Sequence, residues 1–210
     1  MLNTHKFILK RRSKFTMKEI PLVFGISGVA RCGKDTLANN LKLKLERNGY
    51  PTIKLSFATA LKEELDPFIQ KQFGFSAFTE VQREKDLIRP LLVCYGTEIC
   101  RNKIDKNYWI NRIKDRVKSC NENKVVVIIP DARYENEIKW IKEVGGYTIH
   151  VTRMGIKPAN FQEKVNDPIV KKLSDFKLRW KTFTDEKETC AYHLSKLFCE
   201  NDWSLYGEFK

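Results

Sequence analysis

Two patterns of apolar and polar positions alternate along the chain. Strands are predicted at residues 21–27, 51–57, 124–129 and 147–152. The continuous β-branched run at 124–129 is typical of a strand buried on both faces. Helical spacing is predicted at 35–48, at 58–72, and between Asp131 and the glycine pair at 145–146. Alternating strands and helices indicate an α/β fold whose parallel sheet is covered by helices on both faces.

The remaining segments carry weaker patterns. Residues 80–120 are predicted to form several helical pieces, and 186–197 a late helix followed by a short strand at 196–200. Residues 155–185 lack clear periodicity and are rich in lysine. We expect residues 18–210 to form one domain, because 210 residues suffice for a substantial single core.

The sequence GVARCGKDT, from Gly28 to Thr36, joins the first predicted strand to the first predicted helix. Glycines there let backbone N–H groups approach phosphate oxygens, and the helix N-terminus adds the positive end of its dipole. Lys34 supplies a positive charge to the β- and γ-phosphates. The strict pattern has Ser or Thr directly after the lysine, whereas Asp35 stands here and the hydroxyl follows at Thr36. The segment predicts a nucleotide-binding P-loop.

Two residues of this loop have more than one interpretation. Arg31 is expected to contact phosphate, although an arginine at a loop tip is also compatible with a solvated side chain. Asp35 either orients a magnesium-bound water or is a carboxylate favoured by the helix dipole.

A second block runs from Arg89 through Gly96-Thr97-Glu98 to Arg101, with Tyr108-Trp109 downstream. An arginine fits a phosphate group bidentately, and a Gly-Thr step permits close backbone approach. Trp109 either offers a stacking face to a base or belongs to the core.

A third block begins at Asp131, directly after the apolar run 124–129. Its carboxylate is placed either to orient magnesium through water or to cap the following helix, and the two roles are compatible. Ligands of such sheets bind at the carboxyl ends of the strands, where Gly28–Thr36, Phe57–Lys62, Asp131–Arg133 and Arg153 all occur.

Charge and cysteine content change this picture little. The 39 basic and 26 acidic residues give a net charge of +13, which suits anionic ligands without selecting one. The six cysteines show no metal-binding spacing, so we expect reduced thiols, a cytoplasmic location and no structural metal.

His150 is expected to be a packed residue. Residues 1–17 are basic and acid-free, which favours a disordered extension over a targeting peptide.

At these three blocks the chain resembles the deoxynucleoside monophosphate kinases of large DNA viruses and phages. The resemblance rests on SGVARCGKDT, on Arg89 with GTE and a following arginine and Tyr-Trp pair, and on the motif Asp-x-Arg-aromatic-x-Asn-Glu at 131–137. It runs from about residue 21 to 153. It implies a P-loop kinase that transfers the γ-phosphate of ATP to a deoxynucleoside monophosphate (dNMP) with Mg²⁺, and family members are often dimers.

The resemblance also assigns roles to individual residues. The donor site would comprise Gly28, Ala30, Arg31, Gly33, Lys34, Asp35, Thr36 and Arg153. The acceptor site, in a helical segment at about 58–120, would comprise Phe57, Lys62, Arg89, Gly96, Thr97, Arg101 and Trp109. Catalysis would rest on Arg31, Lys34, Asp35, Asp131 and Arg133. Thr36 and Asp131 would serve the metal.

Three points stay open at this stage. Residues 155–185 stand where such kinases carry a closing lid, but they contain lysines and only Arg179 as a guanidinium. Another small-molecule kinase, such as a dephospho-coenzyme A kinase, shares the loop and the fold. A nucleic-acid-binding or regulatory NTPase would suit the +13 charge, although the scattered basic residues lead us to expect neither a nucleic acid nor a membrane as partner.

Overall fold

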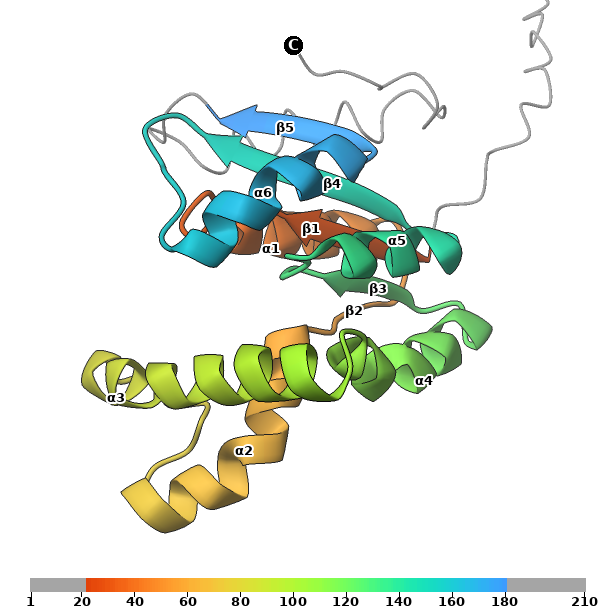
Figure 1. The fold of residues 1–210 in the computed structure, drawn as a ribbon. Coiled ribbons are helices and arrows are strands. Elements are labelled where there is room, and N and C mark those ends of the chain that lie inside the picture. The colour runs from red at the N-terminus through yellow and green to blue at the C-terminus, as the bar shows by residue number, and fades with distance from the viewer. Residues whose placement is uncertain (1–21, 181–210) are drawn as a thin grey trace, which may run out of the picture.

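The structure is a computed structural model that describes residues 22–180. Its centre is a five-stranded, wholly parallel sheet in the order β2-β3-β1-β4-β5 (Figure 1). The strands are β1 (Val23–Ser27), β2 (Thr52–Lys54), β3 (Val126–Ile129), β4 (Tyr147–Arg153) and β5 (Phe176–Trp180). The predicted α/β architecture is confirmed.

Helices connect the strands and cover both faces of the sheet. They are α1 (Lys34–Arg47), α2 (Phe57–Phe73), α3 (Gln82–Val93), the π-helix η1 (Cys94–Ile104), α4 (Tyr108–Glu122), α5 (Glu135–Glu143) and α6 (Phe161–Leu173). Adjacent residues of one strand face opposite layers, as pleating requires. Ile128 packs with α1, for example, and Ile129 packs with α4 and α5 on the other face.

Helix α1 covers one face because its leucines recur at every fourth position. Leu37, Leu41 and Leu45 are completely buried against the sheet, which confirms the spacing that predicted this helix. Helices α4, α5 and part of α6 cover the opposite face. The P-loop lies between β1 and α1, at the carboxyl edge of the sheet.

Helices α2, α3 and η1 form an arm that extends away from the sheet (Figure 1). The arm has a small core of its own, formed by Leu65 and Ile69 of α2, by Ala77, and by Ile88 of α3. Helix η1 continues directly from α3, and its wider turn is visible in the bond that the Asp105 N–H donates to the Cys100 carbonyl. This arm corresponds to the helical segment predicted at 58–120.

One predicted boundary was wrong, and one segment without a predicted pattern is regular. The second strand ends at Lys54 rather than at residue 57, because Ser56 caps α2 by accepting a hydrogen bond from the Thr59 N–H. Residues 155–185, which lacked periodicity, contain α6 and the sheet strand β5. Strand β5 belongs to the sheet, and the role of this segment as a lid stays a prediction.

Other sequence predictions fall outside residues 22–180, namely the basic extension at 1–17, the helix at 186–197 and the strand at 196–200. Within the described range, no helix combines the length and the apolar character needed to cross a bilayer.

Candidate active site

The P-loop has the backbone geometry of an anion cradle. Gly28 has a φ of 130°, and a Cβ at this position would lie 2.3 Å from the Val151 carbonyl oxygen of β4. Gly33, with a φ of 99°, is the N-cap of α1. Arg31 has a φ of 65°, which is uncommon for a residue with a side chain. The two glycines therefore let the loop fold tightly between β4 and the start of α1.

The Lys34 ammonium group is buried at the centre of this loop. It donates hydrogen bonds to the carbonyl oxygens of Gly28, at 2.8 Å, and Val29, at 2.7 Å. Only 9% of the residue is exposed. A buried cation held by neutral carbonyls favours an anionic partner, because the carbonyls leave its charge uncompensated.

Two other groups beside the loop are packed rather than reactive. The Cys32 side chain is completely buried, and this burial raises the pKa of its thiol. His150 of β4 is also completely buried, as predicted, and its Nε2 lies 2.9 Å from Asp167 Oδ1 on α6.

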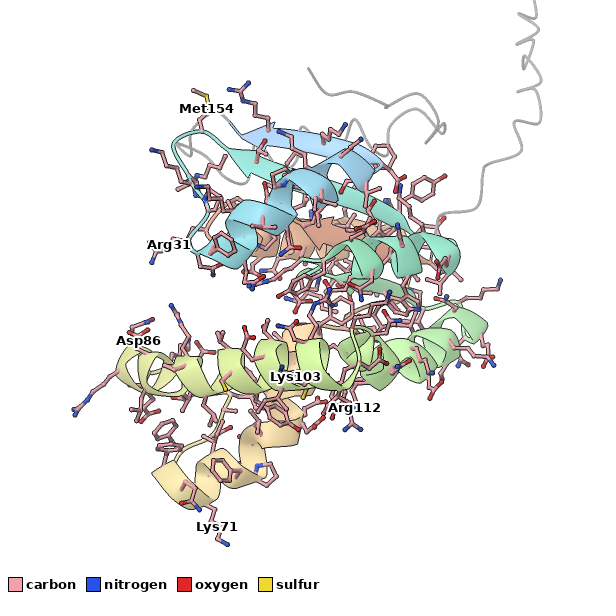
Figure 2. The ribbon with its side chains drawn as sticks, viewed as in Figure 1. Arg31, Lys71, Asp86, Lys103, Arg112 and Met154 are labelled. Atoms are coloured by element: carbon pink, nitrogen blue, oxygen red, sulfur yellow. The ribbon has the colours of Figure 1, made fainter. Side chains whose placement is uncertain are left out.

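The rim of the loop carries two arginines that the sequence singled out. Arg153 Nη1 donates to the Arg31 carbonyl oxygen at 3.3 Å, so these residues lie together. Figure 2 shows the Arg31 side chain projecting from the edge of the molecule, away from the sheet. Asp35 and Thr36 lie in the first turn of α1, with Asp35 exposed to solvent.

A cleft of about 390 Å³ opens beside the P-loop. Its walls come from the loop, from the end of α3 and the start of η1, from the turn after β3, and from α6. The lining residues are Gly28, Val29, Val93, Thr97, Ala132, Arg133, Tyr134, Asn160, Phe161, Gln162, Glu163, Asn166, Asp167 and Val170. The cleft therefore brings the predicted first, second and third blocks to one place.

Asp131 joins the sheet to the helical arm. One of its carboxylate oxygens accepts from the Ser56 hydroxyl at 2.7 Å and the Ala58 N–H at 2.8 Å, and the other accepts from the Phe57 N–H at 3.1 Å. Asp131 thus caps the N-terminus of α2. Capping of the helix that follows in sequence was one of the two roles considered for Asp131, but Tyr134 is the N-cap of α5.

Glu137 lies beneath the turn that carries Arg133. Its Oε2 accepts from the N–H groups of Arg133, at 2.7 Å, and Tyr134, at 3.0 Å. Burial raises the pKa of this carboxyl group to about 7, because desolvation outweighs these hydrogen bonds and the nearby Asp131 carboxylate adds to the increase. The turn is therefore held by a carboxyl group that changes its protonation state near neutral pH.

Arg101 connects η1 to this same turn. It donates to Asn136 Oδ1 at 2.7 Å and to the Lys106 carbonyl oxygen at 2.8 Å, and its guanidinium carbon lies 3.6 Å from the centre of the Tyr134 ring. The second and third sequence blocks are thus in direct contact.

Trp109 is buried in the core, the second of the two roles that its sequence position allowed. Only 8% of it is exposed, and its Nε1 donates to the Gly96 carbonyl oxygen at 2.9 Å. Gly96 in turn gives Leu61 of α2 room to pack, because a Cβ there would lie 2.8 Å from Leu61 Cδ2. Both residues shape the arm instead of facing the cleft.

Three further residues assigned to the acceptor site do not line the cleft either. Arg89 is exposed on α3, 3.7 Å from Asp86, and Lys62 lies over the Phe78 ring. Phe57 is buried against Trp140. Of the seven residues predicted to bind the acceptor, Thr97 is the one among the cleft-lining residues.

The α6 wall of the cleft was not predicted. Its Glu163 carboxylate accepts from the Ala30 N–H of the P-loop, at 3.1 and 3.2 Å to its two oxygens. Asn160, followed three residues later by Glu163, is a helix-start signal that could have identified α6. Pro168 inside the helix and its mostly polar surface obscured the apolar periodicity.

Comparison with known proteins points to one family. Residues 69–165 match the family model described as deoxynucleotide monophosphate kinase. The chain is 29% identical over 151 residues to a protein of Acanthamoeba polyphaga mimivirus, named provisionally as a deoxynucleotide monophosphate kinase, with 64% of this chain and 76% of that protein covered. It is 31% identical over 71 residues to the deoxynucleotide monophosphate kinase of Enterobacteria phage T4, covering 33% of this chain and 30% of that enzyme.

Solved structures show more distant likenesses. An APS kinase of Mycobacterium tuberculosis is 12% identical with a TM-score of 0.43, covering 84% of this chain and 96% of that chain. A shikimate kinase of Aquifex aeolicus is 17% identical with a TM-score of 0.42, and the match covers 83% of this chain and 95% of that chain. Likenesses of this size carry no functional argument, so the fold assignment rests on the sheet order and the P-loop of this chain.

Proposed function

We propose that this chain transfers the γ-phosphate of ATP to a dNMP. The match to the deoxynucleotide monophosphate kinase model and the similarity to the two viral relatives support this proposal. The observation that carries this proposal is the junction of the P-loop with the cleft. One wall of that cleft is an anion cradle, and the others include Thr97 and Arg133 of the matched segment 69–165.

On this proposal, Lys34 holds the donor phosphates. Its ammonium group exchanges the Gly28 and Val29 carbonyls for phosphate oxygens, which carry full negative charge. The N–H groups at the start of α1 add their partial positive charges. Arg31 and Arg153 lie at the rim of the loop, where they would contact the outer part of the donor.

Arg133 is proposed to stabilise the charge of the phosphoryl group during transfer. It lines the cleft beside the loop, and the Glu137 carboxyl group holds its backbone. Arg101 positions the same turn through Asn136 and Tyr134. We propose that Arg101 acts on the acceptor through this turn, whereas Arg89 and Lys62 would need the arm to move before reaching it.

The donor set fits Mg²⁺ in part. Thr36 offers a hydroxyl oxygen beside Lys34 in the first turn of α1, and oxygen is the ligand type that magnesium prefers. Asp131 already accepts three hydrogen bonds, so we propose that it and Asp35 would act through water molecules. Bound magnesium would supply charge neutralisation between the donor phosphates.

Several wider expectations are also proposals. The turn before α6 and the start of α6 would serve as the part of 155–185 that closes over the cleft. A cytoplasmic location and a homodimer remain predictions. The family match disfavours a dephospho-coenzyme A kinase, because it covers the block around Gly96-Thr97 that distinguished the two in sequence.

A coupled ADP-release assay tests the reaction. ATP and magnesium would be combined with each of the four dNMPs and four ribonucleoside monophosphates in turn. We expect ADP formation that depends on one or more dNMPs. ADP formation independent of any monophosphate would indicate an NTPase, and no turnover with all eight would reject the proposal.

A further inference from the structure

The Glu163 carboxylate occupies an anion site on the P-loop. Both of its oxygens accept from the Ala30 N–H, and Oε2 also accepts from the Ala159 N–H at 2.9 Å. Arg133 Nη1 lies 3.9 Å from Oε1. With its side chain only 10% exposed, Glu163 is enclosed by one loop N–H group, one N–H group of its own turn and one guanidinium group.

These are donors that a phosphoryl group would use. Carboxylates and phosphates both accept charge-assisted hydrogen bonds from backbone N–H groups and from arginine. The same site cannot hold Glu163 and a phosphate oxygen together, because two anions at this distance repel each other and compete for the same N–H group.

The position of Ala30 identifies which phosphate would compete. Lys34 and the N-terminus of α1 lie at one end of the loop, whereas the Ala30 N–H contacts α6 through Glu163, a residue that lines the cleft. The donor must extend from α1 toward an acceptor in that cleft, so its terminal phosphoryl group is the part that arrives beside Ala30 and Arg133.

We propose that the Ala30 N–H and the Arg133 guanidinium form the subsite of the terminal donor phosphoryl group, and that Glu163 fills this subsite until a triphosphate displaces it. The inference rests on the proposed phosphoryl transfer. Because Glu163 lies in the first turn of α6, its displacement frees the start of that helix from the loop. Donor binding is thereby coupled to the position of the start of α6, which forms one wall of the acceptor cleft.

The test compares two nucleotides that differ by one phosphate. Binding of ADP and of the non-hydrolysable triphosphate AMP-PNP would be measured by calorimetry, without acceptor, for the wild type and Glu163→Gln. Removing a charged competitor should lower the AMP-PNP Kd about tenfold and change the ADP Kd less than about twofold. Asp167→Asn is the matched control, since it removes a charge from the same cleft one turn further along α6.

Several results would overturn the proposal. If Glu163→Gln raised the affinity for both nucleotides equally, a general charge effect would be indicated. The same would follow if Asp167→Asn raised the AMP-PNP affinity as much as Glu163→Gln does. Unchanged or weaker AMP-PNP binding would show that Glu163 does not compete. If Glu163→Gln fails to fold, the wild-type Ala159 amide resonance still decides, because AMP-PNP should break the bond from this N–H to Glu163 and shift the resonance, whereas ADP should leave both unchanged.

The outcome is separable from that of the proposed function, because these measurements contain no acceptor. A selective gain for AMP-PNP in a chain that phosphorylates no dNMP would keep the subsite and reject the reaction. Transfer to a dNMP without that gain would keep the reaction and reject the role of Glu163.

Discussion

The Glu137 carboxyl group shows how a single buried residue ties stability to pH. Its folded-state pKa of about 7 lies above the ordinary value of 4.5. Between these values the native protein binds a proton that the unfolded chain has lost, so the free energy of unfolding falls as the pH rises. The total loss is about 3 kcal/mol and is complete slightly above pH 7.

We therefore expect Glu137→Gln to remove this decline. The amide oxygen can still accept from the N–H groups of Arg133 and Tyr134, whereas no ionisation follows. Urea unfolding at pH 5, 6, 7 and 8 would measure the difference from the wild type. Glu135→Gln, an exposed substitution on the same helix, is the control. Parallel pH dependences for the wild type and Glu137→Gln would contradict the prediction.

Lys34 provides the second prediction at the scale of the residue. Lys34→Ala should reduce kcat by about 100-fold or more, because it removes a preorganised cation from the transferring phosphates. The leucines of α1 remain, so the melting temperature should change little. The coupled assay and thermal unfolding measure both effects, with Lys44→Ala in the last turn of α1 as control. Near-normal turnover in Lys34→Ala would show that Lys34 is not a catalytic residue.

At the scale of the element, the contact between α2 and η1 depends on the missing side chain of Gly96. Gly96→Ala places a Cβ 2.8 Å from Leu61 Cδ2, and the resulting overpacking should cost about 1 to 3 kcal/mol. Leu61→Ala alone should also destabilise, by leaving a cavity. The double variant should lose less unfolding free energy than the two single variants lose together. Denaturant unfolding of the wild type and the three variants would measure this difference. Additive losses would show that the two residues do not share this contact.

The elements that the sequence predicted are those whose pattern is local. Leu37, Leu41 and Leu45 specify α1, and the β-branched run ending at Ile129 specifies β3, because each buries a face that its own residues define. The carboxylates were harder to assign. Asp131 caps a helix that begins about 75 positions earlier in the chain, and Glu163 reaches a loop about 130 positions before it. Residues so far apart in sequence form no local spacing pattern, so these contacts could not be predicted. The P-loop could be predicted because its residues are contiguous.

At the scale of the whole molecule, residues 22–180 contain a five-stranded sheet and the cleft. We expect a chain lacking residues 1–16, and starting at Met17, to keep its dNMP-dependent ADP release within about twofold, because the described strands and the cleft-lining residues are all retained. The removed residues lie outside the described range, and all five strands of the described sheet lie within the part of the chain that is kept. Purified full-length and shortened proteins would be compared in the coupled assay and by thermal unfolding. Loss of folding in the shortened protein would contradict this.

The strand order has a consequence for how the protein is made. Strand β1 is central, yet its partners lie far along the chain, since Val23 pairs with Val127 and Phe24 with Tyr147. At about 5 to 20 residues per second, a ribosome needs roughly 5 to 20 seconds to supply the first of these partners. During that interval, the apolar strand ahead of the P-loop has both edges unpaired. The slow step in biogenesis is thus built into the same topology that brings the loop, Asp131 and α6 together.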